Sequence, residues 1–132
     1  MRSGVILVAL SGWLVLAGCA QPSRQEIKLV HVVLFKVKPG CPPEMRQEMR
    51  EDAERLLADL PMVRGLWLGT PADTKTPDRP MVKDDYDLGL AVLFDDVDGL
   101  NDYLEHPDHV TFARRHDPRC DLRVFDIVTP GP

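Results

Sequence analysis

Three histidines and one tyrosine carry the side chains best suited to chemistry in this sequence. His31 lies in a β-rich stretch, whereas Tyr103, His106 and His109 follow one another closely in the second half of the chain. Histidine moves protons near neutral pH, and a tyrosine hydroxyl can hold or polarise a carbonyl oxygen. Tyr103 and His106 are three residues apart, which allows them to share a helix face. Together these groups are chemically able to enolise a carbonyl compound or to assist an aldol-type ring closure.

The two histidines around Pro107 also have structural and metal-binding interpretations. Proline disfavours helix at the residue before it, so His106 and His109 are suited to capping a kinked helix and to hydrogen-bonding loops. His106, Asp108 and His109 are spaced like metal ligands. Zinc usually needs three or four protein ligands, and the sequence has no Cys-x-x-Cys or His-Glu-x-x-His motif. No metal or cofactor is therefore predicted.

Two further histidines are placed by the residues around them. His31 shares one face of its strand with Val33 and Phe35, so it either lines a cavity or lies in the core. His116 is expected at the surface.

The elements that must position these residues follow a β-α-β-β-α-β order. Apolar and β-branched runs predict four strands, over residues 29–38, 63–70, 86–94 and 122–128. Apolar residues three and four apart predict a helix over 43–60. A second helix begins at Asp95 or Asp96, kinks at Pro107 and continues over 108–115. This order is typical of a ferredoxin-like α+β sandwich with sheet order 4-1-3-2, and the long polar loop 71–85 joins the second and third strands.

The sheet order predicts that two cysteines are neighbours. Cys41 follows the first strand and Cys120 precedes the fourth, and these two strands are adjacent and antiparallel in the predicted sheet. A disulfide between them would stabilise the fold by roughly 4 kcal/mol in the chain-entropy description. Two free thiols, held apart by the proline-rich turn, are the alternative.

The N-terminus predicts export. Arg2 precedes an apolar run over 5–16 that is shorter than the about 20 residues of a membrane-spanning helix. Residues 1–18 are expected to be a signal peptide, and Leu16-Ala17-Gly18-Cys19 resembles a bacterial lipobox, which makes Cys19 the lipidated residue. The alternative is an ordinary secretory signal with an incidental cysteine. We expect a tether over 19–28, a domain over 29–128, a tail over 129–132, and anchoring at the periplasmic face, with the outer membrane favoured because no Asp follows Cys19.

Composition limits the partners. The formal net charge is −5 and no basic cluster is present, which argues against nucleic-acid binding and against electrostatic adhesion to anionic lipid. Membrane association is therefore expected to come from the anchor alone.

Four segments together resemble the stress-responsive A/B barrel (Dabb) family. They are the stretch from His31 to Lys36, the stretch from Phe94 to Tyr103, His106-Pro107-Asp108-His109, and Val124-Phe125-Asp126. The resemblance implies a ferredoxin-like fold whose copies pair their sheets into a homodimeric α+β barrel. One plant member closes a polyketide chain, and its catalytic tyrosine and histidine fall on Tyr103 and His109. The same resemblance places His31 in a ligand pocket, where Phe35 and His106 are further candidates.

Two functions remain open at this point. In the first, the domain is a module that binds a small apolar ligand or serves a stress response without turnover. In the second, it is a lyase or cyclase acting on a carbonyl-rich small molecule, with His109 as the acid or base and Tyr103 positioning the oxygen. A monooxygenase of the related ferredoxin-like group is a more distant alternative, and the sequence leaves open whether the protein is an enzyme.

Overall fold

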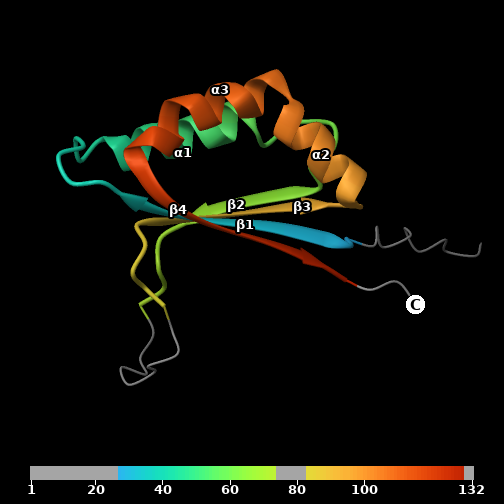
Figure 1. Ribbon diagram of the computed structural model, residues 1–132, viewed down its shortest axis with the longest axis horizontal. Helices are drawn as coiled ribbons and strands as arrows, with labels where there is room; N and C mark the ends of the chain where they lie inside the picture. Colours follow the sequence, from blue (N-terminus) through green and yellow to red (C-terminus); the bar gives the residue numbers. More distant parts are fainter. Residues whose placement is uncertain (1–26, 74–82, 130–132) are drawn as a thin grey trace, which may run out of the picture.

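The computed structural model describes residues 27–73 and 83–129, which form an antiparallel sheet covered by helices on one face (Figure 1). The predicted signal peptide, Cys19, most of the tether and of the tail, and the middle of the 71–85 loop lie outside the described residues. Within the described ranges, no helix combines the length and apolar character needed to cross a membrane.

The sheet has four strands in the order β2-β3-β1-β4, as predicted. Each neighbouring pair is antiparallel. The strands are β1 (Leu29–Val37), β2 (Gly65–Gly69), β3 (Leu88–Phe94) and β4 (Cys120–Val128). Both faces of β3 carry apolar residues, which suits its position between β2 and β1. The ferredoxin-like fold class is thus confirmed.

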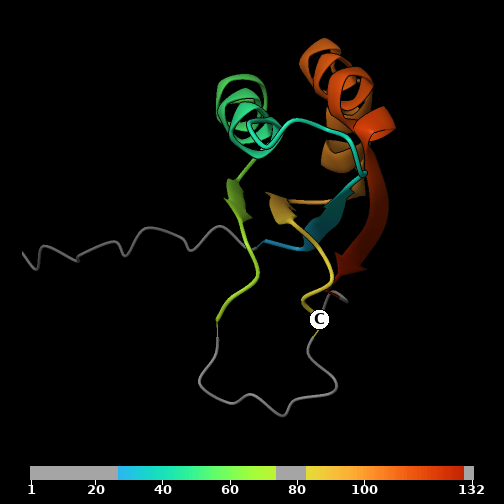
Figure 2. The ribbon, with the colours of Figure 1, turned by 90° about the vertical axis from the view of Figure 1, so that its left-hand side faces the viewer.

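The helices all lie on one side of the sheet (Figure 2). They are α1 (Met45–Leu56), α2 (Val97–Glu105), α3 (Pro107–His116) and the short 3₁₀ helix η1 (Asp117–Arg119). The first helix ends four residues before the predicted Leu60, because the backbone passes into turns from Leu57 onward. Leu57 and Leu60 nevertheless stay buried, so the apolar pattern correctly marked the core beyond the end of the helix.

The break between α2 and α3 forms where Pro107 predicted it. Asp96 caps α2 by accepting a hydrogen bond from the Gly99 amide at 2.8 Å. His106 leaves the helical conformation, with ψ at 135°, and Pro107 then starts α3. The chain therefore changes direction between Tyr103 and His109.

The core lies between the inner face of the sheet and the helices. Alternate residues of β1 and β3 point inward and are buried, and Met49, Ala53 and Leu57 meet them from the α1 side. At the edge strand β4 the inward-facing positions are less covered, because Leu122 and Val124 stay exposed. This uncovered edge opens the space in which the candidate site lies.

The outer face of the sheet carries an apolar row across all four strands. Trp67, Ala91, Val32 and Phe125 are paired in register, so their side chains share one face. No described helix covers this face (Figure 2). Trp67 is 61% exposed and Phe125 49% exposed.

Candidate functional site

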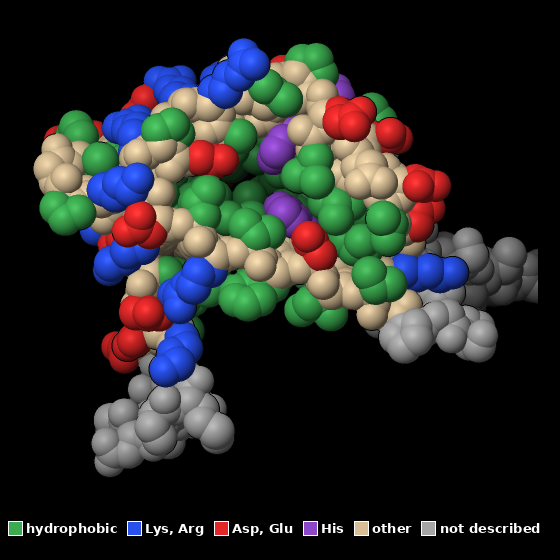
Figure 3. Space-filling model, in the orientation of Figure 1, with side chains coloured by type: hydrophobic (Ala, Val, Ile, Leu, Met, Phe, Trp, Pro, Cys, Tyr) green, Lys and Arg blue, Asp and Glu red, His purple; other side chains and the backbone are tan. Residues whose placement is uncertain are grey.

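A cavity of about 210 Å³ lies between the inner face of the sheet and the α2–α3 pair. Most of its wall is apolar, and its polar lining comes from His31, Tyr103, His109, Asp117 and Asp126. Figure 3 shows this hollow, with histidine side chains at its edges and hydrophobic side chains inside it. A mostly apolar cavity with a few polar groups is the usual form of a small-molecule site.

His31 is held at the cavity wall by Asp126. The two residues are directly paired between β1 and β4, and His31 Nδ1 lies 2.6 Å from Asp126 Oδ1. Because an ionised carboxylate only accepts hydrogen bonds, Nδ1 carries the proton and donates. That bond fixes the ring and its tautomer, which leaves Nε2 of neutral His31 without a proton. The buried ring meets Tyr103 edge-on, with centroids 6.0 Å apart.

Tyr103 is buried at the centre of the site. Its ring lies 5.1 Å from that of Phe94 and 4.5 Å from that of His109, measured between centroids. Burial raises the pKa of its hydroxyl well above the usual value, and the Asp117 charge raises it further. The hydroxyl therefore keeps its proton. Among the described residues it has no recorded hydrogen-bond acceptor, so it is available to donate to a ligand.

His109 is oriented by the helix break. Asp108 N–H, which in a continuous helix would bond the Leu104 carbonyl, instead donates to His106 Nδ1 at 3.2 Å. His109 Nδ1 donates instead to the Leu104 carbonyl, at 3.0 Å. Since a carbonyl only accepts, Nδ1 is protonated and Nε2 of the neutral ring has a free lone pair. Burial lowers the pKa of His109, nearby His31 and His106 lower it further, and the bond to Leu104 opposes them.

The other two predicted pocket residues, Phe35 and His106, lie in different surroundings. Phe35 lines the cavity from β1 and packs edge-on against Phe112. His106 is absent from the cavity lining and accepts the Asp108 N–H as the N-cap of α3. The structure thus gives His106 a capping role, as the structural interpretation of the Pro107 kink predicted, and its assignment as a ligand-binding residue stays a prediction.

His116 was wrongly expected at the surface. It is fully buried between α1 and α3, and its Nε2 lies 2.9 Å from Asp52 Oδ2. Asp52 also accepts from Arg55 at 2.6 Å and pairs with Arg115 at 3.0 Å. The sequence signal was present, because His116 is four residues from buried Phe112 and so shares its helix face.

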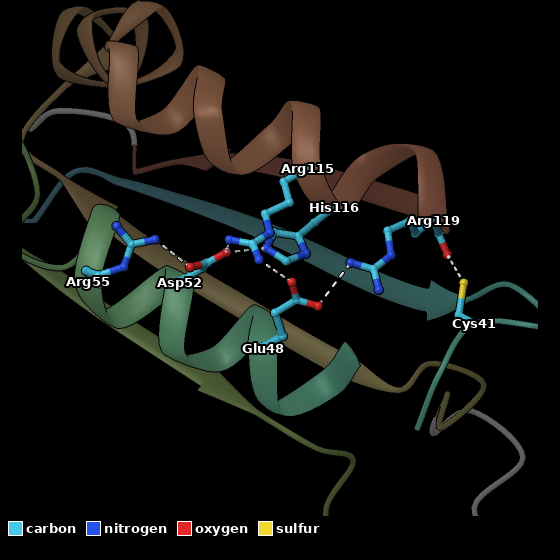
Figure 4. A network of polar contacts seen from close by, with 7 residues as sticks. All are labelled: Cys41, Glu48, Asp52, Arg55, Arg115, His116 and Arg119. Atoms are coloured by element: carbon cyan, nitrogen blue, oxygen red, sulfur yellow. Dashed lines mark hydrogen bonds and ion pairs between the residues drawn. The ribbon is translucent and has the colours of Figure 1, made fainter. Parts of the chain in front are cut away.

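The polar network extends along the contact between the helices (Figure 4). Glu48 of α1 bonds Arg115 of α3 and Arg119 of η1. The Cys41 thiol lies 3.7 Å from the Arg119 carbonyl. These contacts join the helix layer to the start of β4, away from the cavity.

The predicted disulfide is not formed in the structure. Cys41 and Cys120 are both free thiols, although the topology brings their segments together as predicted. Val37 pairs with Cys120, and the Lys38 amide donates to the Arg119 carbonyl at 3.0 Å. The Cys41 thiol is directed to that same carbonyl instead of to Cys120. Burial raises the pKa of Cys120 to about 11, with nearby Cys41 adding to the shift.

Asp117 is a site residue that the sequence did not indicate. It follows α3, lines the cavity and is partly buried. Its proximity to Tyr103 depends on how η1 folds back to the sheet, which no local pattern reveals. Within residues 27–73 and 83–129, no group of three or more His, Cys, Asp or Glu side chains is arranged to hold a metal ion.

Comparisons with known proteins agree with this fold. The family model described as "Stress responsive A/B Barrel Domain" matches residues 29–129. A Dabb family protein of ferredoxin-like fold from Mesorhizobium loti is 24% identical, with a TM-score of 0.62, covering 80% of this chain and 100% of its own. A dimeric ferredoxin-like protein of unknown function from Thermobifida fusca is 21% identical, with a TM-score of 0.64 and coverage of 80% and 93%.

A hydroxynitrile lyase from Passiflora edulis has the same fold. It is 18% identical, with a TM-score of 0.66, covering 81% of this chain and 98% of its own. At such identities the likeness concerns the fold alone. The comparison with curated proteins found no match. Because the family model spans the whole described sheet and its helices, the chain belongs to the stress-responsive A/B barrel (Dabb) family.

Proposed function

We propose that this protein binds a small, largely apolar molecule that carries one oxygen function. The observation that carries the proposal is the apolar cavity between the α2–α3 pair and β4, into which polar groups converge. Its volume of about 210 Å³ lies below the roughly 300–1,000 Å³ of pockets for drug-sized ligands. The ligand is therefore of the size of a substituted benzene ring or a short branched chain.

Two groups define the chemistry of the ligand oxygen. The Tyr103 hydroxyl keeps its proton and donates, and Nε2 of neutral His109 accepts. Burial makes an unpaired polar group unfavourable, so a ligand oxygen that pairs with Tyr103 gains more than the same contact would give in water. An aryl ketone satisfies both the apolar wall and the Tyr103 donor.

The binding test is a titration with acetophenone, followed by amide chemical shifts. We expect saturable shifts at residues that line the cavity. Ala113→Phe places a large ring in the cavity and should abolish them, because Ala113 is part of the lining. Val97→Phe, at an exposed position of α2, is the control and should bind like the wild type. Equal shifts in wild type and Ala113→Phe, or no shifts in the wild type, would contradict the proposal.

Turnover is a second candidate, supported by the state of His109. Its Nε2 has a free lone pair, its pKa is lowered, and its ring lies 4.5 Å from that of Tyr103, between centroids. A neutral histidine beside a protonated tyrosine is suited to removing a proton next to a carbonyl that the tyrosine holds. Exchange of the methyl protons of acetophenone into D₂O would report this step. Equal exchange by wild type and His109→Gln would remove His109 from it.

The assembly we propose is a homodimer formed through the outer face of the sheet. The support is the exposed apolar row of Trp67, Ala91, Val32 and Phe125, together with the dimeric description of the Thermobifida fusca protein. An exposed apolar face of this kind marks a contact with another protein surface. A second copy of the same face is self-complementary and closes the assembly.

The location we propose is a membrane surface, reached through a lipid on Cys19. The support is the signal-like leader followed by Leu16-Ala17-Gly18-Cys19. Expressed in a bacterium that processes lipoproteins, the wild type should fractionate with membranes and Cys19→Ser should not. Cys41→Ser is the matched control, because it removes a thiol outside the leader. Equal membrane fractions for wild type and Cys19→Ser would contradict the proposal.

A further inference from the structure

Asp117 occupies a position that is unfavourable for a carboxylate in three respects. It is the C-cap of the ten-residue helix α3, where the helix dipole places partial negative charge that the three-residue η1 beginning at Asp117 offsets only in part. It is partly buried, and burial raises the pKa of its carboxyl, an effect that nearby His116 opposes. Among the described residues its side chain has no recorded hydrogen bond or ion pair. A carboxylate in such surroundings is normally paired.

The cavity places this carboxylate where a ligand could pair with it. Asp117 lines it, together with a second acidic residue, Asp126. Asp126 is already engaged by His31 at 2.6 Å, and its side chain is half-exposed. Asp117 is thus the acidic residue of the lining whose carboxylate has neither oxygen paired with a described side chain, whereas Asp126 keeps only its Oδ2 free.

We infer that Asp117 selects ligands by charge and hydrogen-bonding type: it accepts a hydrogen bond from a hydroxyl group on the apolar ligand and excludes carboxylates. The inference rests on the proposed function, since it concerns the same cavity. A neutral hydroxyl supplies the missing donor to Asp117. A carboxylate in the same cavity would meet the like charges of partly buried Asp117 and half-exposed Asp126, which water screens less completely there than in bulk solvent. The preferred ligand class is therefore a small phenol or alcohol with an apolar body, whose hydroxyl oxygen can accept from Tyr103 as a ketone oxygen does and whose hydroxyl proton also pairs with Asp117.

The test compares three probes of one shape by calorimetric titration at pH 7. They are propylbenzene, which has no polar group, 4-propylphenol, which carries a neutral donor, and 4-propylbenzoate, which is an anion. For the wild type we expect 4-propylphenol to bind about tenfold more tightly than propylbenzene, because a hydrogen bond to a charged acceptor is stronger than a neutral one. We expect 4-propylbenzoate to bind more weakly than propylbenzene.

Variants of Asp117 separate its role from the rest of the cavity. Asp117→Asn keeps the shape and removes the charge, so it should shrink the phenol preference and tighten 4-propylbenzoate binding about tenfold. Its affinity for propylbenzene should equal that of the wild type, which shows that the cavity is intact. Asp117→Glu keeps the charge and should retain both preferences. Asp102→Asn removes a charge from an exposed position of α2 and is the matched control.

The outcomes distinguish the two proposals. If propylbenzene binds and the ratios among the three probes are the same in wild type and Asp117→Asn, the inference about Asp117 is overturned while the binding function stands. A wild type that binds 4-propylbenzoate as tightly as 4-propylphenol also overturns the inference, whatever the variants do. If no probe binds the wild type, the binding function fails and the inference fails with it.

Discussion

At the scale of single residues, the buried and half-buried titratable side chains discussed above form two sets. One set faces the cavity, where Tyr103 and His109 each have a polar atom free for a ligand. The other lies between α1 and α3, where His116 Nε2 pairs with Asp52 and the buried His116 Nδ1 has no hydrogen-bond partner among the described residues. Buried titratable groups occur in both places, so burial alone does not mark a functional site. The cavity is what separates them.

The lowered pKa of His109 makes folding stability depend on pH in a defined direction. Burial disfavours its protonated form, so the unfolded chain binds a proton that the folded chain resists. Its contribution is therefore complete above the unfolded pKa of about 6.5 and is lost as the pH falls through the folded pKa. Urea unfolding of wild type and His109→Gln from pH 8 to pH 5 should show a smaller loss for the variant. Equal pH dependence of the free energy of unfolding in wild type and variant would contradict the lowered pKa of His109. The other histidines are present in both proteins, so their contributions cancel in the difference.

The Asp52–His116 pair should dominate the stability of the helix layer. Asp52→Ala leaves the buried Nε2–H of His116 without its acceptor and is expected to lower the free energy of unfolding by about 3 kcal/mol. Asp59→Ala, at an exposed position just after α1, is the control and should change it by less than about 0.5 kcal/mol. Denaturant unfolding at pH 7 measures both. Equal stabilities for the two variants would show that the pair is not stabilising.

The same pair carries a pH signature. Burial raises the pKa of Asp52, but hydrogen bonds from Arg55 and His116 and the charge of Arg115 together hold it below its usual value. A carboxyl with a lowered folded pKa contributes stability above its unfolded pKa and loses it as the pH falls through the folded pKa. The difference between wild type and Asp52→Ala should therefore shrink below about pH 4.

At the scale of elements, the chain pattern predicted most of what the structure contains. Alternation in Leu29–Val37 and Leu88–Phe94 placed both central strands, and Pro107 placed the break between α2 and α3. These patterns depend only on residues that are close in the sequence, so they can be interpreted before the tertiary structure is known. The cavity has no local signal, because it depends on how far the α2–α3 pair stands from β4. Tyr103 and His109 were singled out by residue type and spacing, and the family resemblance then pointed to the same two residues, whereas Asp117 had neither kind of signal.

The cysteines show how topology predicts proximity without predicting a bond. The segments of Cys41 and Cys120 meet as the sheet order required, and both thiols are free in the structure. A disulfide between them stays a prediction, and it depends on the proposed export to an oxidising compartment. Forming it removes two protons and two electrons from the thiols, which a disulfide-exchange partner would accept.

The measurement is a count of thiols in the unreduced, denatured protein, resolved by peptide mass. We expect Cys41 and Cys120 to be unreactive and linked after export, and the bond to add roughly 4 kcal/mol to the free energy of unfolding in the chain-entropy description. In Cys41→Ser, Cys120 should become reactive. Full alkylation of both cysteines in the exported wild-type protein would exclude the bond.

At the scale of the whole molecule, the helices cover one face of the sheet and the dimer would cover the other. An edge strand with both faces partly exposed, such as β4, gains most from a partner. The outward-facing residues of β4 include Phe125 and Ile127, and both side chains are exposed in the single chain. The cavity is lined by the inward-facing residues of the same strand, so β4 would contribute one face to the cavity and the other to the dimer.

The proposed dimer makes the last prediction. A Trp67→Asp, Phe125→Asp double variant places a charge at each end of the apolar row on the outer face, and unpaired buried charges weaken association strongly. We expect its dissociation constant to rise at least about 100-fold, which corresponds to about 2.7 kcal/mol. Val97→Asp, whose side chain is exposed on α2 on the opposite side of the sheet, should leave the dimer intact. Sedimentation velocity across a concentration series distinguishes the two species. A wild type that stays monomeric at high micromolar concentration would show that no such dimer forms. A double variant that stays dimeric would place the subunit contact elsewhere, because the two substitutions disrupt the apolar row that pairs Trp67 with Ala91 and Val32 with Phe125.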